Sequence, residues 1–237
     1  PVLSSAASDV YKRQSQYLEK MPDTQKDIYY ISAETSAQAL ASPHLEGFKS
    51  KNIPVLIMTD AIDQFWLPMV GSFKEKKFTS ITQGKINLDE LDSKNKDKKN
   101  KSNDDKDKQD KEYVDLIAQL KVVLGDQVKD IRLSSKLTDS PVCLVADEGD
   151  MDIAMEQLMA QRDSNYKGAP RILEINGDHS LIKNMKSLLS KKESNDLVSD
   201  AGTLLFEQAR LMEGKMPADP AQFSKIMNQF LLKAIPN

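Results

Sequence analysis

The stretch DLVSDAGTLLFEQARLMEGKMPADPAQFSKIMNQFLLKAI, residues 196–235, predicts two amphipathic helices separated by a tight break. In both helices the apolar residues recur on a 3.6-residue period, so each helix carries one continuous apolar stripe. Gly214 and Pro217 mark the end of the first helix, and Asp219 and Pro220 mark the start of the second. The stripe residues are Leu197, Ala201, Leu204, Leu205, Ala209 and Met212 in the first helix and Phe223, Ile226, Met227, Phe230, Leu231 and Ala234 in the second. Such a hairpin has to bury its stripes either against its own domain or against a second copy of the chain, and the pattern leaves both arrangements open.

The composition is that of a soluble globular protein, long enough for one large or two modest domains. Its 237 residues are 39% hydrophobic and carry a formal net charge of −3, which is too small to favour nucleic acid or an acidic membrane surface as a partner. The sequence contains no apolar run long enough to cross a bilayer and no signal peptide at its start. The single cysteine, Cys143, excludes an intramolecular disulfide and favours a reducing cytoplasm.

The N-terminal part alternates between strand and helix patterns. Residues 1–14 show no clear period, and we expect a disordered or extraneous lead-in. Strands are predicted at 28–31, 54–58 and 78–82, and the continuous apolar run of the second is typical of a strand buried on both faces. This alternation predicts an α/β unit over residues 15–84, with a small βαβ three-layer arrangement.

Two helices are expected between these strands. The first begins at about Thr35 and is broken or kinked by Pro43. The second follows Asp60, which with Asp63 resembles a capping box, and Pro68 should bend or shorten it.

Residues 85–112 form the clearest boundary in the sequence. Their core, SKNKDKKNKSNDDKDKQDKE at 93–112, contains no apolar residue, so it cannot bury enough surface to offset the entropy lost on ordering. The opposite charges nearly cancel, which predicts a solvated linker and argues against a nucleic-acid arm.

The remaining residues, 113–237, predict a second, α+β domain. A helical stripe from Tyr113 to Leu124 is closed by Gly125, and strands are expected at 128–133, 142–145 and 171–175. A further helix carries Leu181, Ile182, Met185, Leu188 and Leu189, and the terminal hairpin comes last. The predicted fold class is therefore α/β followed by α+β, with the sheet preceding most of its helices.

Sequence motifs for catalysis are missing. The glycines form no phosphate-binding loop, and neither His44 nor His179 has a partner at metal-ligand spacing. The acidic residues 147–150 lack the ligand spacing of a calcium loop, and Asp150 is better explained as a helix cap. We therefore expect no catalytic residue, no cofactor site and no metal site in this chain.

Two features favour binding of other proteins. A predicted helix over 151–161 carries a methionine-rich stripe, and methionine side chains suit varied apolar partners, although pattern alone favours ordinary core packing. Phe65 and Trp66 are adjacent and cannot both point inward from one helix, and Met69 follows on the same helix. The stripe residues are Met151, Ala154, Met155, Leu158 and Met159.

Several segments resemble one family, the ninety-kilodalton heat-shock chaperones, and most closely its bacterial form. DIYYISAE (27–34) and ASPHLEGFKSKNIPVLIMTDAIDQF (41–65) are similar to the C-terminal part of the family's middle domain. VVLGDQVKDIRLSSKLTDSPVCLVADEGDM (122–151) and LEINGDHSLIKNM (173–185) are similar to its C-terminal dimerisation domain. The resemblance runs from about Ser15 to Ile235.

The resemblance implies a fragment of an ATP-dependent chaperone that forms a homodimer and contacts unfolded client proteins. It implies that ATP and Mg bind to an N-terminal domain outside this chain, so that the fragment itself is not an enzyme. The implied client-binding residues are Phe65, Trp66, Met69, Met151, Met155, Leu158 and Met159. The implied dimerisation residues are Leu197, Ala201, Leu204, Leu205, Met212, Phe223, Ile226, Met227, Phe230 and Leu231.

Two other functions stay open at this point. One is a small-molecule hydrolase or transferase with an unrecognised site near Asp60, and the other is a structural adaptor without a client surface. Two interpretations of Gly202 stay open. A helical glycine either lowers helix stability by about 1 kcal/mol relative to alanine or permits another helix to approach closely.

Overall fold

The computed structural model describes residues 2–4, 17, 21–22, 25–60, 62–84, 86, 88, 99–162, 168–190 and 195–235, and it leaves out the side chains of 2–4, 64–66, 68, 99–110 and 190. Contacts divide the chain into two compact units. Unit 1 comprises Pro1–Lys99, Ser135–Asp139 and Val145–Ala169, and unit 2 comprises Asn100–Ser134, Ser140–Leu144 and Pro170–Asn237. The chain limits of the domains predicted from the sequence stay a prediction. The fold is mixed α/β, with one small sheet in each unit.

The sheet of unit 1 has the strand order β1-β3-β2-β5-β4. Strand β2 (Ile28–Ser32) pairs in parallel with both β3 (Val55–Met58) and β5 (Lys76–Ser80), and the short β4 (Ser72–Phe73) pairs antiparallel with β5. Strands form where the sequence predicts them, although β5 begins and ends two residues earlier than the predicted 78–82.

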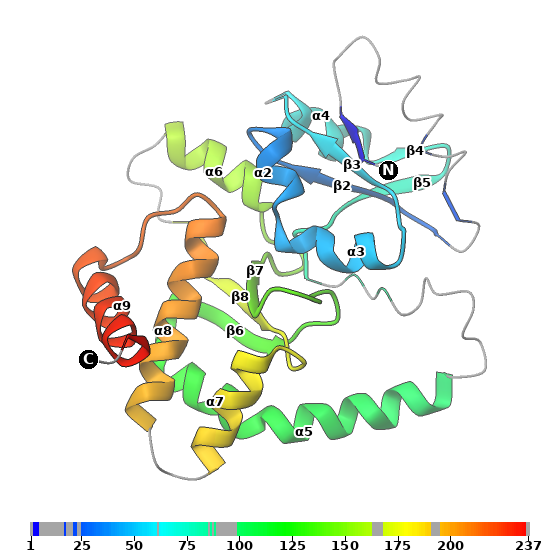
Figure 1. The fold of residues 1–237 in the computed structure, drawn as a ribbon. Helices are drawn as coiled ribbons and strands as arrows, with labels where there is room; N and C mark the ends of the chain where they lie inside the picture. The colour runs from blue at the N-terminus through cyan, green and yellow to red at the C-terminus, as the bar shows by residue number, and fades with distance from the viewer. Residues whose placement is uncertain are drawn as a thin grey trace. The chain divides into compact units, whose positions relative to one another are not determined.

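Helices cover both faces of this sheet (Figure 1). Helix α2 (Ser36–Leu40), the 3₁₀ turn η1 (Pro43–Leu45) and α3 (Glu46–Ser50) lie on one side, and α4 (Asp63–Val70) lies on the other. Alternate residues of each strand therefore enter different cores. The first core contains Tyr29, Ile31, Phe48, Val55 and Ile57, and the second contains Ile28, Leu56, Met58 and Leu67. Burial of β3 on both faces confirms the prediction made from its continuous apolar run.

The start of α4 differs from the predicted capping box. No side chain caps this helix, and its first turn is closed by the backbone, with the Asp63 amide donating to the Asp60 carbonyl oxygen at 2.9 Å. The main-chain turn satisfies an amide that the predicted cap would have satisfied with a carboxylate. Pro68 lies inside α4, which ends two residues later at Val70.

The first strand lies within residues 1–14, for which we expected a disordered or extraneous lead-in. Strand β1 (Val2–Ser4) pairs in parallel with β3 as an edge strand, and the expectation of an extraneous segment stays a prediction. Backbone pairing with a neighbouring strand needs no hydrophobic period, which is why the sequence pattern misses it. Residues 5–14 lie outside the described part of the chain.

Unit 2 has a three-stranded sheet in the order β6-β8-β7. Strand β6 (Val128–Leu133) pairs in parallel with β8 (Arg171–Ile175), and β7 (Val142–Val145) completes the sheet at the predicted positions. Helix α5 (Lys99–Leu124) leads through the 3₁₀ turn η4 (Gly125–Gln127) into β6.

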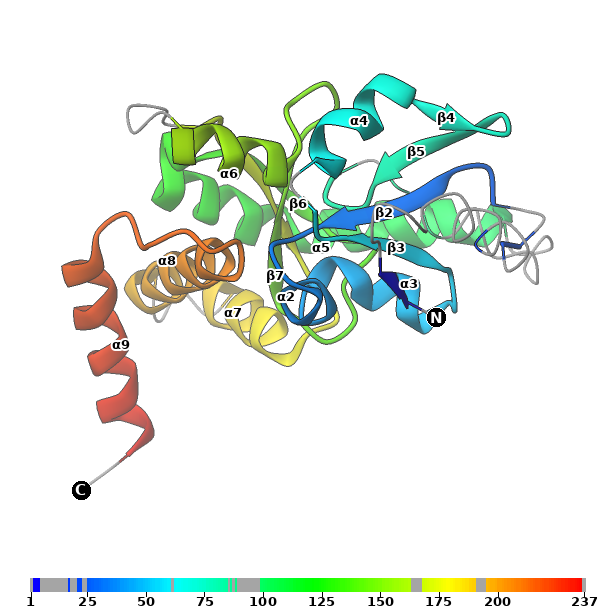
Figure 2. The ribbon, with the colours of Figure 1, turned by 90° about the horizontal axis from the view of Figure 1, so that it is seen from above.

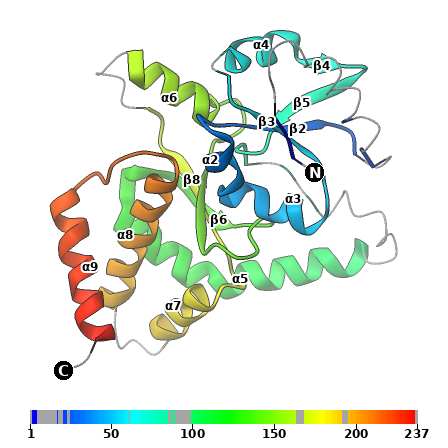
Figure 3. The ribbon, with the colours of Figure 1, turned by 45° about the horizontal axis from the view of Figure 1, so that its top comes forward.

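The other helices of unit 2 follow its last strand. They are α7 (Ser180–Ser190), α8 (Asn195–Met212) and α9 (Pro220–Ala234). Residues of α5, α7 and α8 form one core with the sheet. Figures 2 and 3 show α9 beside α8, on the side away from the sheet, so α8 lies between α9 and the sheet.

Helix α5 begins inside the predicted charged linker. The linker was expected to be irregular through residue 112, but the helix starts at Lys99. The buried turns from Tyr113 to Leu124 supply the costly nucleus, and extending an existing helix costs little. Lysines and aspartates that alternate along such an extension can also pair three or four residues apart. Residues 89–98 of the linker lie outside the described part.

Gly202 of α8 allows a close approach between helices. It is buried, and a Cβ atom at this position would collide with the side chain of Leu120 on α5. The structure therefore answers the question that the sequence left open, because an alanine would need Leu120 to move within a filled core.

Buried His44 predicts an acid-sensitive unit 1. Burial, and secondarily the Lys136 ammonium, lower the pKa of His44 from 6.5 to about 3. Between these values the unfolded chain binds a proton that the folded chain does not, so stability is complete above the unfolded pKa and is lost as the pH falls. We expect the free energy of unfolding to drop by about 2 kcal/mol between about pH 7 and about pH 5, measured by urea unfolding. His44→Gln should remove this part of the pH dependence, and His179→Gln, at a half-buried position in unit 2, should keep it.

Candidate functional site

The terminal hairpin forms as predicted from the sequence. The Asp219 side chain accepts hydrogen bonds from the amides of Ala221 and Gln222, at 3.0 and 2.9 Å, and Pro220 occupies the first turn of α9. Gly214 ends the preceding helix with a φ of +78°, a backbone conformation that glycine adopts without strain. The two helices therefore begin and end where their capping residues predict.

The stripe of α8 is largely covered within its own unit. Ala201, Leu205 and Ala209 are buried in the core of unit 2, and Leu197 and Leu204 are half-buried. Met212, at the C-terminal end of α8, is 48% exposed. Most of this helix therefore serves the protomer's own core, and only its last turn leaves apolar surface outside.

The stripe of α9 is covered along one edge only. Ile226 is buried, and Phe223 and Phe230 are half-buried, with Phe230 packed against the core of unit 2. Met227 and Leu231, one helical turn apart on the other edge, are 39% and 49% exposed. A regular apolar face of α9 thus faces away from its own core.

The second group of predicted residues lies on α4 and α6. Helix α6 (Ile153–Arg162) begins two residues later than the predicted helix. Met155, Leu158 and Met159 on it are half-buried, Met151 just before it is 41% exposed, and Met69 on α4 is 86% exposed. Ala154, the remaining member of the predicted stripe, is buried. The side chains of Phe65 and Trp66 lie outside those that the structure describes.

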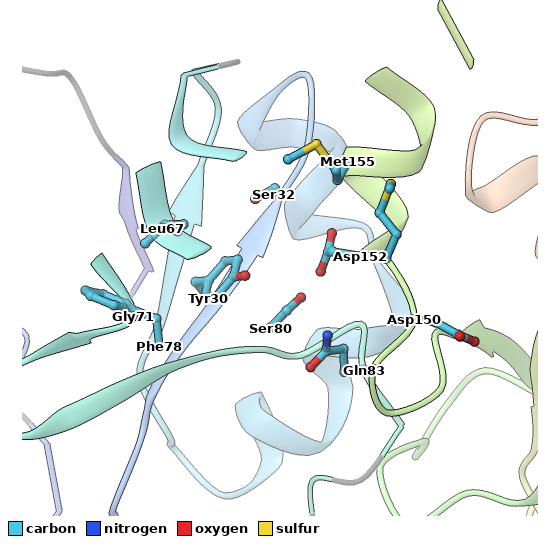
Figure 4. Close-up of a pocket in the computed structure, with 12 residues that line it drawn as sticks. Tyr30, Ser32, Leu67, Gly71, Phe78, Ser80, Gln83, Asp150, Asp152 and Met155 are labelled. Carbon is cyan, nitrogen blue, oxygen red and sulfur yellow. The ribbon is translucent and has the colours of Figure 1, made fainter. Parts of the chain in front are cut away.

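A cavity of about 560 Å³ within unit 1 brings α4 and the start of α6 together. Leu67 and Phe78 contribute apolar surface, and Met151 and Met155 contribute methionine side chains (Figure 4). Its described lining is completed by Tyr30, Ser32, Gly71, Ser80, Gln83, Gly149, Asp150 and Asp152. Helix α4 and the start of α6, both predicted to contact other proteins, therefore border the same cavity.

Hydroxyl groups lie at and behind the lining of the cavity, with Ser80 and Asp152 in the lining and the buried Thr82 outside it. Thr82 donates from its hydroxyl to the Asp152 carboxylate at 2.9 Å, and the hydroxyl oxygens of Ser80 and Thr82 are 2.9 Å apart. Because each hydroxyl has one proton and that of Thr82 goes to Asp152, Ser80 is the donor to Thr82. Tyr30 and Ser80 both line the cavity. Burial, and secondarily the Asp152 carboxylate, raise the pKa of Tyr30, so the phenol stays protonated.

The cap of α6 corrects the role expected for Asp150. Asp152 accepts a hydrogen bond from the Ala154 amide at 2.9 Å, and its carbonyl oxygen accepts one from the Glu156 amide at 2.9 Å. Asp152 is thus the capping residue, because the helix starts at Ile153 and not at Met151. Figure 4 shows the Asp150 carboxylate pointing away from the other labelled side chains.

Sequence reasoning missed the polar residues in and behind the lining of the cavity. Tyr30, Ser80 and Thr82 lie in or next to strands β2 and β5, where their pattern indicates only strand structure. The signal that could have been used is the acidic run ending at Asp152, but its partners are about seventy residues away in the sequence. Asp60, near which an alternative enzyme site was predicted, is exposed and is not among the described lining residues.

The described residues contain neither a metal-binding cluster nor a membrane-spanning helix. No group of three or more histidine, cysteine, aspartate or glutamate residues there could hold a metal ion. Within the same part of the chain, no helix is long and apolar enough to span a bilayer.

Comparison with known proteins identifies the family. The family model described as "Hsp90 protein" matches residues 2–236, which includes the segment 2–14 that the motif resemblance did not cover. A protein named chaperone protein HtpG from Roseobacter denitrificans is 38% identical over 234 residues, which are 98% of this chain and 37% of that protein. Proteins of the same name from Streptomyces coelicolor and Wolbachia pipientis are 36% and 38% identical, over 89% and 92% of this chain and 32% and 34% of theirs.

The chain therefore spans about a third of the length of the curated relatives that it matches. Because the family model covers nearly every residue of the chain, its membership does not depend on a single domain or motif. The chain belongs to the Hsp90 protein family.

Proposed function

We propose that this chain supplies the dimerisation surface and part of the client-binding surface of an ATP-dependent molecular chaperone of the HtpG type. The observation that carries the proposal is the exposed edge of the α9 stripe. In a 15-residue amphipathic helix of which Ile226 is the buried residue, Met227 and Leu231 still keep the apolar period. A face of this kind is stable in water only when another apolar surface covers it.

The occupant that fits this face best is a second copy of the same hairpin. A two-fold axis would bring α8 and α9 of one chain against α8 and α9 of the other, which makes a four-helix arrangement from one repeated surface. Met212 at the end of α8 and Met227 and Leu231 on α9 then lose their exposure together. The predicted dimerisation residues Ala201, Leu205 and Ile226 act indirectly, because their burial in the protomer holds the hairpin in place.

Light scattering of the unmodified chain tests the assembly. We expect a molar mass of two chains, each of 26.6 kDa, at micromolar concentration. A mass of one chain at that concentration would contradict the proposal.

The proposed client surface consists of Met69 on α4 and Met151, Met155, Leu158 and Met159 at α6. Methionine side chains are flexible and polarisable, so they adapt to apolar segments of differing shape. The exposure of Met69 and Met151 makes them available to a partner, and the half-buried residues behind them support the surface. Phe65 and Trp66 belong to this surface by the family resemblance alone.

Met151→Asp combined with Met155→Asp should abolish most of the suppression of aggregation of a model unfolded protein. The substitutions place charges where unfolded apolar segments would bind, and light scattering of the aggregating protein measures the effect. Val114→Asp with Val122→Asp is the matched control, because both valines are exposed on α5. Undiminished suppression by the methionine variant would favour a structural adaptor without a client surface.

ATP and Mg belong, in this proposal, to the N-terminal domain of the whole protein. This chain then neither binds nor hydrolyses ATP by itself. The single buried cysteine, Cys143, is the argument for a reducing cytoplasm as its compartment.

A further inference from the structure

The cavity beside α6 is lined by both apolar side chains and polar groups. Figure 4 shows Leu67, Phe78 and the Tyr30 ring on one side and Met155 and Asp152 on the other, with Ser80 between them. A side chain that uses the whole lining must have an apolar stem and a polar end.

The Asp152 carboxylate determines which kind of polar end fits best. The hydroxyl protons of Ser80 and Thr82 are both used, since Ser80 donates to Thr82 and Thr82 to Asp152. The other polar side chains Ser32, Gln83 and Tyr30 of the lining can donate as well as accept, whereas the Asp152 carboxylate only accepts and carries the charge. A cation with hydrogen-bond donors therefore gains most from this lining.

The Asp152 carboxylate supplies negative charge without a cation beside it. Its two oxygens accept one hydrogen bond each, from the Ala154 amide and from the Thr82 hydroxyl, and each has room for another. None of the ion pairs between described residues includes Asp152, and the described lining of the cavity contains no lysine or arginine. The residue is half-buried, so its charge is less screened than one on the open surface.

We propose that this cavity takes an arginine side chain of an unfolded client segment, with the neighbouring apolar residues of that segment lying on Met69 and Met151. This inference rests on the proposed client-binding function and names the chemistry that the surface recognises. Arginine combines a three-carbon stem with a planar cation that has five donors and no acceptor. Its guanidinium is weakly hydrated and stacks on aromatic faces such as those of Tyr30 and Phe78, which distinguishes it from the strongly hydrated lysine ammonium.

A pair of short peptides tests the proposal with the full chain. One peptide carries an arginine between bulky apolar residues, and its twin carries citrulline, which keeps the shape and removes the charge. Fluorescence anisotropy should give an affinity about tenfold higher for the arginine peptide, because a hydrogen bond to a charged group contributes more than one between neutral groups. The ratio should fall at high salt, and a lysine peptide should bind between the two.

Two variants locate the effect at the cavity, and one serves as control. Asp152→Asn removes the charge, and Tyr30→Phe removes the phenol oxygen without touching the cap of α6. Both should bring the ratio of the two affinities to below about threefold, with circular dichroism checking that each variant is folded. Glu148→Gln removes an exposed carboxylate that does not line the cavity, and it should keep the full ratio.

The outcomes separate this inference from the function on which it rests. If both peptides bind equally well to the unmodified chain, the arginine preference is wrong and client binding stands. The same holds if Tyr30→Phe and Asp152→Asn keep the full ratio. If neither peptide binds and aggregation is not suppressed, the proposed function and the inference both fail.

Discussion

Replacing Met227 and Leu231 together by aspartate should convert a dimer of this chain into monomers. Both side chains are exposed in the protomer, so the substitutions leave the core of unit 2 intact. In a two-fold dimer the pair occurs twice, and four carboxylates would enter an apolar interface without partners. Each unpaired buried charge costs several kcal/mol, so the dissociation constant should rise by at least roughly a thousandfold. Sedimentation velocity of both proteins measures the change.

The control for this prediction adds the same charge to the same helix. Gln222→Asp with Gln229→Asp places two carboxylates on the polar face of α9, where both glutamines are exposed. This variant should sediment as a dimer. If the Met227 and Leu231 variant also sediments as the unmodified chain does, the hairpin is not the interface.

Gly202→Val should destabilise unit 2 by about 2–3 kcal/mol, because it forces extra carbon atoms into a filled core. The valine Cβ would meet the Leu120 side chain, which is itself almost fully buried between α5 and the other helices of the unit. Helix propensity acts in the opposite direction, since any ordinary residue is a better helix former than glycine. Urea unfolding followed by circular dichroism measures the net change in the free energy of unfolding.

Further variants isolate the packing effect. Gln208→Gly and Gln208→Val place glycine and valine at an exposed position of α8, so the difference between these two variants reports the effect of propensity alone. Leu120→Ala removes the atoms that the valine would meet, and the double variant Leu120→Ala with Gly202→Val should be less destabilised than the sum of the two single changes. Additive effects would show that Gly202 does not control the distance between the helices.

The sequence predicted most of the regular elements because their signals are local. The continuous apolar run of β3 indicates burial on both faces, and the structure has it between two cores. Asp219 and Pro220 mark the start of α9 through a hydrogen bond that reaches only three residues along the chain. The errors at Asp60 and Asp150 also concern helix starts. Several acidic residues lie close together at each of these starts, and the backbone conformation decides whether one of them caps the helix and which one it is.

The candidate sites depend on distances along the chain that no local pattern reports. Asp152 and Thr82 are far apart in the sequence, and only the folding of unit 1 brings the Thr82 hydroxyl to the Asp152 carboxylate that lines the cavity. Met151 and Met155 could be identified as a soft apolar stripe, but their place beside Leu67 could not. The stripes of the terminal hairpin likewise could be recognised without the structure, whereas their division into covered and exposed edges could not.

The residue order alone determined which side chains share a face of each helix and strand, because the backbone period of 3.6 or 2 residues is a property of local geometry. It also identified the family, through motifs that the family model matches over nearly the whole chain. The tertiary structure decided what each face meets: Leu120 against Gly202, Thr82 against Asp152, and open solvent against Met227 and Leu231. The reason is that a periodic stripe specifies that a face is apolar, while its partner depends on how distant parts of the chain pack.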